Sequence, residues 1–180
     1  MSSVEWVSTS APYLTPRERG QQDAWSTETS AKGRRGSQRI VHAGEVTAPA
    51  EIAEALGVEQ GAAVVVRRRI MYLDERPCEL TDTYYPLPVA GGTRLAGTAK
   101  IPGGAVTLLA ELGYVGVRAR EDVTARLPST EEAAALETEL LQPVLQLLRI
   151  TFDTHDRPVQ ADRIVMSAQL QRLRYDVRIG

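Results

Sequence analysis

The chain contains the stretch Arg69-Ile70-Met71-Tyr72-Leu73-Asp74-Glu75-Arg76-Pro77-Cys78-Glu79, and a similar stretch follows as Arg149-Ile150-Thr151-Phe152-Asp153-Thr154-His155-Asp156-Arg157-Pro158-Val159-Gln160. Each copy reads as a strand, a turn and a returning strand, and the second turn is one residue longer. A predicted helix precedes each copy. Two helix-plus-hairpin units, each with one apolar face, can bury those faces in one sheet. The repeat therefore predicts two pseudo-symmetric halves with a seam between them, where pockets form.

Turn and capping residues delimit the predicted elements. Pro49 opens one helix and Gly57 ends it, Ser26 is the expected cap of an earlier one, and Ser129 with Glu132 has capping-box spacing. Helices are predicted at residues 27–32, 50–56, 106–112 and 130–140, and strands at 40–47, 62–73, 78–85, 115–127, 143–152, 159–166 and 173–179. This order predicts an α+β fold in which helices pack on a mostly antiparallel sheet.

The composition is that of an ordinary globular chain, since 43% of its 180 residues are hydrophobic and 24% are charged. Its formal net charge is −2, whereas a chain that binds the phosphate backbone of nucleic acid carries a strong excess of Lys and Arg. We therefore expect no direct contact between this chain and DNA.

Cysteine content and the absence of targeting signals indicate the compartment. The single cysteine, Cys78, excludes an intrachain disulfide and favours a reducing interior. Residues 1–10 lack the basic start and apolar run of a signal peptide. The longest aliphatic stretch, residues 62–66, is too short to span a bilayer. The sequence predicts a cytoplasmic protein with no membrane partner.

The N-terminal part of the chain is polar but carries large aromatic side chains, namely Trp6, Tyr13 and Trp25. Such a segment is more often an ordered loop laid over the body than a free tail. These aromatics could cover an apolar face of a ligand or could be core residues that pin the loop. We predict an aromatic-containing arm at residues 1–24 and a ligand-sensing domain at residues 25–180.

Alternation along the first hairpin brings charged side chains to one face of the predicted sheet. Arg67 and Arg69 share a face of their strand, and Glu79 lies on the returning strand. A guanidinium binds carboxylate or phosphate oxygens through two parallel bonds, and a glutamate accepts from a hydroxyl or an ammonium. The trio therefore suits a polar or anionic small molecule. The alternative is a solvated strand face with local ion pairs.

Gly103 and Gly104 precede a predicted helix, where free backbone N–H groups can attract an anion. The alternative is a simple Gly-Gly turn. His42 and His155 stand alone, without neighbours at metal-ligand spacing, and no nucleophile elbow or phosphate loop is present. The sequence therefore predicts no metal, no cofactor and no catalytic set.

The hairpin Val64-Val65-Val66-Arg67-Arg68-Arg69 with Asp74-Glu75-Arg76-Pro77-Cys78-Glu79-Leu80-Thr81-Asp82-Thr83-Tyr84-Tyr85-Pro86 resembles the centre of UTRA domains. The later Gly103-Gly104-Ala105-Val106-Thr107-Leu108-Leu109-Ala110-Glu111-Leu112-Gly113-Tyr114, Val123-Thr124-Ala125-Arg126, Glu131-Glu132-Ala133 and Arg157-Pro158-Val159 continue the resemblance. UTRA domains are the effector-binding modules of the HutC branch of bacterial GntR-type transcription regulators. The resemblance implies a chorismate-lyase-like fold, a homodimer and a small-molecule sensor.

The resemblance also implies a set of ligand-binding residues. In relatives with phosphosugar effectors the corresponding positions contact the ligand, and they are here Trp25, Ser26, Arg67, Arg69, Glu79, Gly104, Ala105, Val106, Gln160 and Met166. Three of these depart from the family pattern, because Gln160 replaces an acidic residue, Met166 a tyrosine and Gly104 a serine. The departures predict an effector that is less polar than a sugar phosphate or differently charged.

Family regulators carry a winged-helix DNA-binding domain ahead of this module, and no helix-turn-helix pattern precedes Trp25. We expect either a truncated regulator or a free-standing sensor, and the Met1 start favours the latter. Two other functions stay open at this stage. The first is a chorismate-lyase-like enzyme, by analogy of fold alone. The second is a dimerisation module that modulates full-length regulators.

Overall fold

The computed structural model describes residues 6–18 and 21–177. Its centre is a six-stranded antiparallel sheet with the order β2-β3-β4-β7-β6-β5. The strands are β2 (Gly36–Thr47), β3 (Ala63–Leu73), β4 (Arg76–Pro86), β5 (Arg118–Arg126), β6 (Val144–Phe152) and β7 (Pro158–Ser167). The two repeats are β2-β3-β4 and β5-β6-β7. They lie side by side in opposite order, with β4 of the first repeat paired with β7 of the second. The predicted antiparallel sheet and internal repeat are confirmed.

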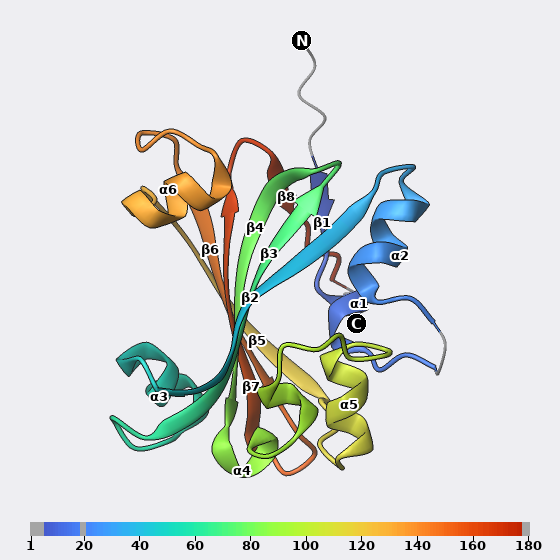
Figure 1. The fold of residues 1–180 in the computed structure, drawn as a ribbon, viewed down its shortest axis with the longest axis vertical. Coiled ribbons are helices and arrows are strands. Elements are labelled where there is room, and N and C mark those ends of the chain that lie inside the picture. The colour runs from blue at the N-terminus through green and yellow to red at the C-terminus, as the bar shows by residue number, and fades with distance from the viewer. Residues whose placement is uncertain (1–5, 19–20, 178–180) are drawn as a thin grey trace.

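The two repeat helices, α3 (Ala50–Leu56) and α6 (Thr130–Leu136), lie on the same side of the sheet (Figure 1). Helix α3 contacts β7 and helix α6 contacts β4, so each packs on a strand of the other repeat. The apolar stripe of α3 is buried in a cluster with Val64, Val66 and Tyr84 of the first hairpin and Ile150 of the second. The repeats thus share one core on this outer face, as their apolar faces require.

The ends of these helices follow local signals. Gly57 adopts the left-handed conformation (φ 64°) after α3, and the Ser129–Glu132 capping box begins α6 as predicted. The prediction that the second helix reaches residue 140 is wrong. It ends at Leu136 because Glu137 adopts a left-handed conformation with φ 52°.

The opposite, inner face of the sheet is covered by helices α1 (Ala11–Leu14), α2 (Ala24–Ala31) and α5 (Ala105–Glu111) (Figure 1). The loop between β4 and α5 contains the short α4 (Leu87–Ala90) and the 3₁₀ turn η1 (Arg94–Ala96). The prediction that Ser26 caps α2 is wrong, because the Asp23 carboxylate accepts the Ser26 N–H at 2.9 Å and the helix begins earlier. Helix α5 begins one residue before the predicted position.

The N-terminal segment is anchored on the inner face. Strand β1 (Trp6–Ser8) pairs in parallel with β8 (Gln171–Leu173), and Trp6 packs edge-on against Trp25 with 5.4 Å between ring centroids. Both indoles are buried in a cluster with Met71, Leu73 and Cys78. The predicted strand at residues 173–179 is wrong, because β8 ends at Leu173 and residues 174–177 have no regular structure. Residues 178–180 lie outside the described part of the chain.

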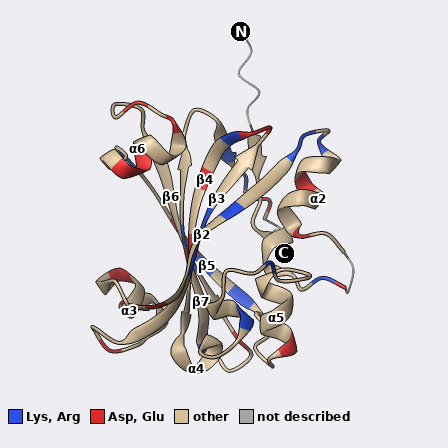
Figure 2. Ribbon diagram, in the orientation of Figure 1, with Lys and Arg blue, Asp and Glu red and all other residues tan. Residues whose placement is uncertain are grey.

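Charge is unevenly distributed over these layers. Figure 2 shows acidic segments on helices of both faces, on α3 and α6 over the outer face and on α2 and α5 over the inner face, and basic segments on strands such as β2 and β5. The partners of the inner-face arginines therefore have to be identified one by one.

Candidate ligand-binding site

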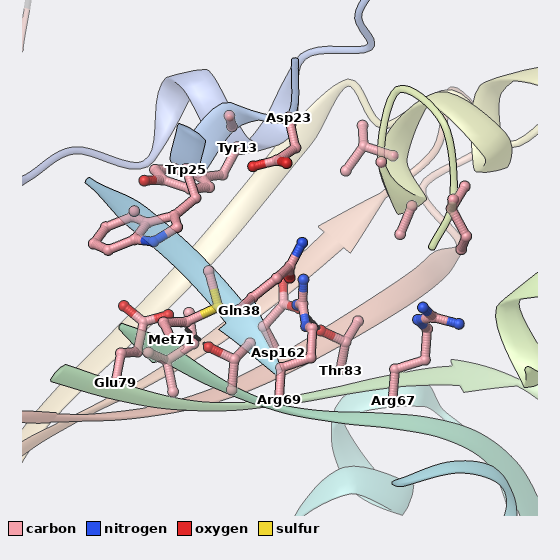
Figure 3. Close-up of a pocket in the computed structure, with 18 of the residues that line it drawn as sticks. Tyr13, Asp23, Trp25, Gln38, Arg67, Arg69, Met71, Glu79, Thr83 and Asp162 are labelled. Carbon is pink, nitrogen blue, oxygen red and sulfur yellow. Dashed lines mark hydrogen bonds between the residues drawn. The ribbon is translucent and has the colours of Figure 1, made fainter. Parts of the chain in front are cut away.

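A cavity of about 680 Å³ lies between the inner face of the sheet and the segments that cover it. This volume is typical of small-molecule sites. Both repeats contribute to its floor, while α1, α2 and the loop before α5 form its walls. All ten residues singled out from the sequence line it, namely Trp25, Ser26, Arg67, Arg69, Glu79, Gly104, Ala105, Val106, Gln160 and Met166. Figure 3 shows part of this arrangement.

Side chains of the first hairpin line the cavity floor, and most of them are polar. Its register pairs Arg67 with Thr83, Arg69 with Thr81 and Met71 with Glu79, and all six residues line the cavity. The expected alternation of side chains along the strands is thus confirmed. The same register sends Arg68 to the outer face, where it lies 3.4 Å from Asp82.

Arg67 uses its guanidinium to hold the loop before α5. Its Nη1 donates to the carbonyl oxygens of Arg94, Leu95 and Gly97, and its Nη2 donates to that of Ala99 at 3.2 Å. The side chain is buried, and burial lowers the pKa of this guanidinium. Arg67 therefore supports the cavity wall, and both of its Nη groups already donate to carbonyl groups.

Arg69 lies at the centre of the floor with donor capacity left over (Figure 3). Its Nη2 donates to Thr83 Oγ1 at 2.9 Å, and Thr83 donates in turn to Asp162 Oδ1 at 2.7 Å. Gln160 Nε2 donates to the other oxygen of Asp162 at 2.8 Å. Among the described residues, Arg69 Nε and Gln160 Oε1 are buried without a hydrogen-bond partner. Asp162 also lines the cavity, and it was not predicted from the sequence.

Arg149 occupies the position of Arg69 in the second repeat but is already neutralised. Its Nε donates to Glu121 Oε1 at 2.6 Å, and its Nη2 donates to Ser10 Oγ at 2.8 Å. Burial raises the pKa of Glu121, but the hydrogen bond of Ser10 and the charge of Arg149 outweigh burial, so this pKa lies below its usual range. Arg149 lines the cavity, and the internal repeat could have predicted this because it aligns Arg149 with Arg69.

Glu79 marks the other end of the cavity, near Trp25 (Figure 3). It accepts a hydrogen bond from Thr81 at 2.5 Å and forms no ion pair within residues 6–18 and 21–177. Its register neighbours on both adjacent strands are methionines, Met71 on β3 and Met166 on β7. Burial raises the pKa of the Glu79 carboxyl, against the opposing effects of the Thr81 hydrogen bond and of Arg69.

The wall formed by the N-terminal segment is tied down by hydrogen bonds. Trp25 Nε1 donates to the Tyr72 carbonyl at 3.1 Å, and the Arg17 backbone N–H donates to Thr107 Oγ1 at 3.0 Å. Tyr13 donates to Glu28, and Ser26 Oγ to Asp23. Trp25 is therefore a core aromatic, as one of the two hypotheses expected, and it also lines the cavity; whether it covers a ligand stays a prediction.

Gly103 and Gly104 shape the wall before α5. Both have positive φ (75° and 87°), a conformation that favours glycine, and the Thr107 hydroxyl donates to the Gly103 carbonyl at 2.8 Å. Within the part of the chain that the structure describes, no three His, Cys, Asp or Glu residues gather in a way that could hold a metal ion. Over the same residues, no helix is long and apolar enough to cross a membrane.

Comparison with known proteins places this architecture in a family. The family model described as the UTRA domain matches residues 31–171. The HTH-type transcriptional regulator SCO4628 of Streptomyces coelicolor is 31% identical over 73% of this chain, and GgaR of Escherichia coli is 24% identical over 76%. The match covers 51% and 53% of those regulators, so the chain spans about half of their length.

Solved structures agree with this assignment. The ligand-binding domain of a GntR-family regulator from Bordetella bronchiseptica is 31% identical, with a TM-score of 0.69 over 80% of this chain and 92% of that domain. PhnF from Mycobacterium smegmatis has a TM-score of 0.79 over 98% of this chain and 73% of its own, at 19% identity, which shows the shared fold.

Proposed function

The chain belongs to the UTRA-domain family, and from this premise we propose that its inner cavity binds a small polar or anionic effector. The observation that carries the proposal is a set of buried polar atoms without hydrogen-bond partners on described residues that line the cavity, namely Arg17 Nε, Arg69 Nε, Gln160 Oε1 and the Tyr85 hydroxyl. Buried polar groups almost always have a hydrogen-bond partner. A bound ligand would supply the missing partners.

The proposed contacts differ in kind. Arg69, Glu79 and Gln160 offer side-chain polar atoms, while Trp25 and Met166 offer apolar surface. Arg67 contributes by holding the wall. The proposed ligand-facing set is that predicted from the sequence, namely Trp25, Ser26, Arg67, Arg69, Glu79, Gly104, Ala105, Val106, Gln160 and Met166.

The biological role follows from the named relatives, which are transcriptional regulators. We propose that this module acts in a GntR/HutC-type regulator in the bacterial cytoplasm, as a homodimer whose geometry shifts when the effector binds. We propose that residues 25–180 form the sensing domain and residues 1–24 an arm that closes the cavity, since Tyr13 and Arg17 line it. The chain itself would not contact DNA.

The enzyme alternative has less support. It rests on the fold analogy with chorismate lyase, whereas the relatives that the chain matches are regulators. We therefore propose a non-enzymatic role, and incubation with chorismate should give no change in absorbance beyond that of a buffer control. For the dimerisation module, no observation favours a role separate from effector binding.

Thermal stability tests the effector proposal, because a ligand that binds only the folded state raises Tm by mass action. Native mass spectrometry of the purified protein identifies co-purifying metabolites, which are then tested with a metabolite library on the wild type, Arg69→Gln and Arg68→Gln. Arg68 is the matched control because it is the next residue on β3 and faces the outer side. We expect the Tm shift to be lost in Arg69→Gln alone. Equal shifts in all three proteins would show that the cavity is not the site.

A further inference from the structure

The cavity floor has opposite charges at separate places that do not pair with each other. Arg69 is turned toward Thr83 and Asp162, while Glu79 extends the other way, toward Trp25 (Figure 3). In the register of β3 and β4, Glu79 is the diagonal neighbour of Arg69, because Arg69 opposes Thr81. Diagonal neighbours in an antiparallel pair are about 7–8 Å apart. This is a separation of backbone positions, and because the two side chains extend in different directions, their charged groups lie at different places along the cavity floor (Figure 3).

Glu79 is a carboxylate that forms no ion pair among the described residues, although the charges of Arg69 and Arg149 act on it from a distance. Methionines occupy the neighbouring register positions on both sides, and Trp25 lies across from it. Neither nearby arginine forms an ion pair with Glu79, because Arg149 pairs with Glu121 and Arg69 donates to the neutral Thr83. A partly buried carboxylate without an ion-pair partner favours a ligand group that brings a positive charge. The indole of Trp25 adds an aromatic surface that suits a cation.

The centre of the floor requires the opposite charge. Arg69 Nε is buried without a partner among the described residues, and so is the hydroxyl of Tyr85, which lies two residues beyond Thr83 on β4. Both atoms are donors that can point at an anionic oxygen. The carboxylate of Asp162 is satisfied by Thr83 and Gln160, so it does not neutralise Arg69 directly.

We propose that the effector is a zwitterion, with an anionic group bound at Arg69 and a cationic amine bound at Glu79 beneath Trp25. The proposal rests on the effector-binding function proposed above and names the chemical class of that effector. A molecule with anionic groups at both ends would bring its second charge onto Glu79. A molecule with a hydroxyl in place of the amine would donate a hydrogen bond to Glu79 but leave its charge unpaired.

The first test needs no ligand and compares Glu79→Gln with Glu121→Gln by thermal unfolding at pH 7.5. Glu79 lacks a cation partner, so removal of its charge should raise Tm by about 3 °C, as expected for a residue kept for binding at a cost in stability. Glu121 neutralises Arg149, so the same substitution there should lower Tm. A fall in Tm for Glu79→Gln as well would mean that the Glu79 charge already has a structural partner, and it would overturn the proposal.

The second test uses four probes with the same five-carbon chain and different ends: 5-aminopentanoate, 5-hydroxypentanoate, glutarate and pentane-1,5-diamine. Binding is followed by NMR through the Arg69 Nε and Trp25 indole signals. We expect 5-aminopentanoate to bind most tightly, and Glu79→Gln to weaken it by at least about tenfold, the value of one hydrogen bond to a charged group. The same variant should leave 5-hydroxypentanoate little changed and should strengthen glutarate.

The outcomes distinguish failure of the zwitterion proposal from failure of the effector-binding proposal. If glutarate or 5-hydroxypentanoate binds at Arg69 at least as tightly as 5-aminopentanoate, or if Glu79→Gln leaves the amino acid unaffected, the zwitterion proposal fails and the binding function stands. If no probe and no metabolite shifts either signal, both proposals fail.

Discussion

Arg69 and Arg149 occupy equivalent positions in the two repeats, yet they have opposite roles. On the neighbouring edge strands, Arg69 opposes Ile40 of β2, whereas Arg149 opposes Glu121 of β5. The second arginine is therefore neutralised within the protein, and the first keeps an unpaired donor. One edge-strand residue decides whether the arginine at this register position forms an ion pair within the protein or keeps an unpaired donor.

The side chains of the two repeats also differ at other positions along the cavity floor. Arg67 in the first repeat corresponds to Leu147 in the second, and Glu79 corresponds to Gln160. Both repeats also carry a register shift at the same place, after Met71 in β3 and after Thr151 in β6. The backbone is thus pseudo-symmetric while the side chains are not, so the two halves of the cavity floor present different chemical groups.

The largest expected effect is the loss of the ion pair in the second repeat. Glu121→Gln leaves the buried charge of Arg149 uncompensated, which should lower the free energy of unfolding by about 3–5 kcal/mol. Urea denaturation measures the change. The double variant Glu121→Ile with Arg149→Leu removes both charges and should recover most of the loss. If the single variant is as stable as the wild type, the pair does not stabilise the repeat.

Replacing Arg67 with the residue of the other repeat, in Arg67→Leu, should release the loop that precedes α5. The carbonyl groups of residues 94–99 lose a charged donor, and we expect a loss of about 2 kcal/mol in unfolding free energy. Hydrogen exchange should become faster in residues 94–104 and stay unchanged in β6. Unchanged exchange in the loop would show that Arg67 does not hold it.

Ile40→Glu gives the first repeat the ion pair of the second. A carboxylate opposite Arg69 should occupy its free donor and weaken binding of 5-aminopentanoate by about tenfold to a hundredfold. Calorimetry measures the affinity, and Ile40→Gln controls for size and polarity. The comparison between repeats would be wrong if both variants bound the probe alike.

Helix capping differs between the repeats as well. Ser129 caps α6 through a capping box, whereas Pro49 precedes α3 without a side-chain cap. Ser129→Ala should therefore cost about 1 kcal/mol of unfolding free energy. The exposed neighbour Thr130→Ala should change it by less than about 0.5 kcal/mol. Similar losses in both variants, measured by urea denaturation, would argue against a specific cap.

The smallest expected effect is a difference in pH dependence between Glu79 and Glu121. The pKa of Glu79 is raised by burial, and besides Thr81 the groups that act on it are Arg69, Arg149 and Asp162, with Tyr13 facing it from α1. A raised pKa means that the folded state binds the proton more tightly, so stability is present at low pH and falls as pH rises through that pKa.

Wild type should therefore lose stability relative to Glu79→Gln as the pH rises above the ordinary range of a glutamate carboxyl and through the raised pKa of Glu79. Glu121, whose pKa is lowered, should do the reverse and contribute stability that is lost as the pH falls through its folded-state pKa. Thermal unfolding over a series of pH values measures both, and parallel pH profiles for the wild type and Glu79→Gln would contradict the assignment.

Features that depend on neighbours along the chain could be predicted from the order of the amino acids. The repeated hairpin predicted the paired halves, Gly57 and the Ser129 capping box predicted helix ends, and alternation predicted that Arg69 and Glu79 share a face. These are local properties, because strand periodicity and capping involve residues a few positions apart.

Which polar groups remain without a partner depends on contacts between segments that are distant along the chain. The carbonyl groups around Arg67 come from a distant loop, and Glu121 reaches Arg149 from the edge strand of the second repeat. The cavity wall likewise depends on a parallel pairing between β1 and β8, from opposite ends of the chain. Hydrogen-bond partners between distant segments follow from register and packing, which local sequence patterns do not encode.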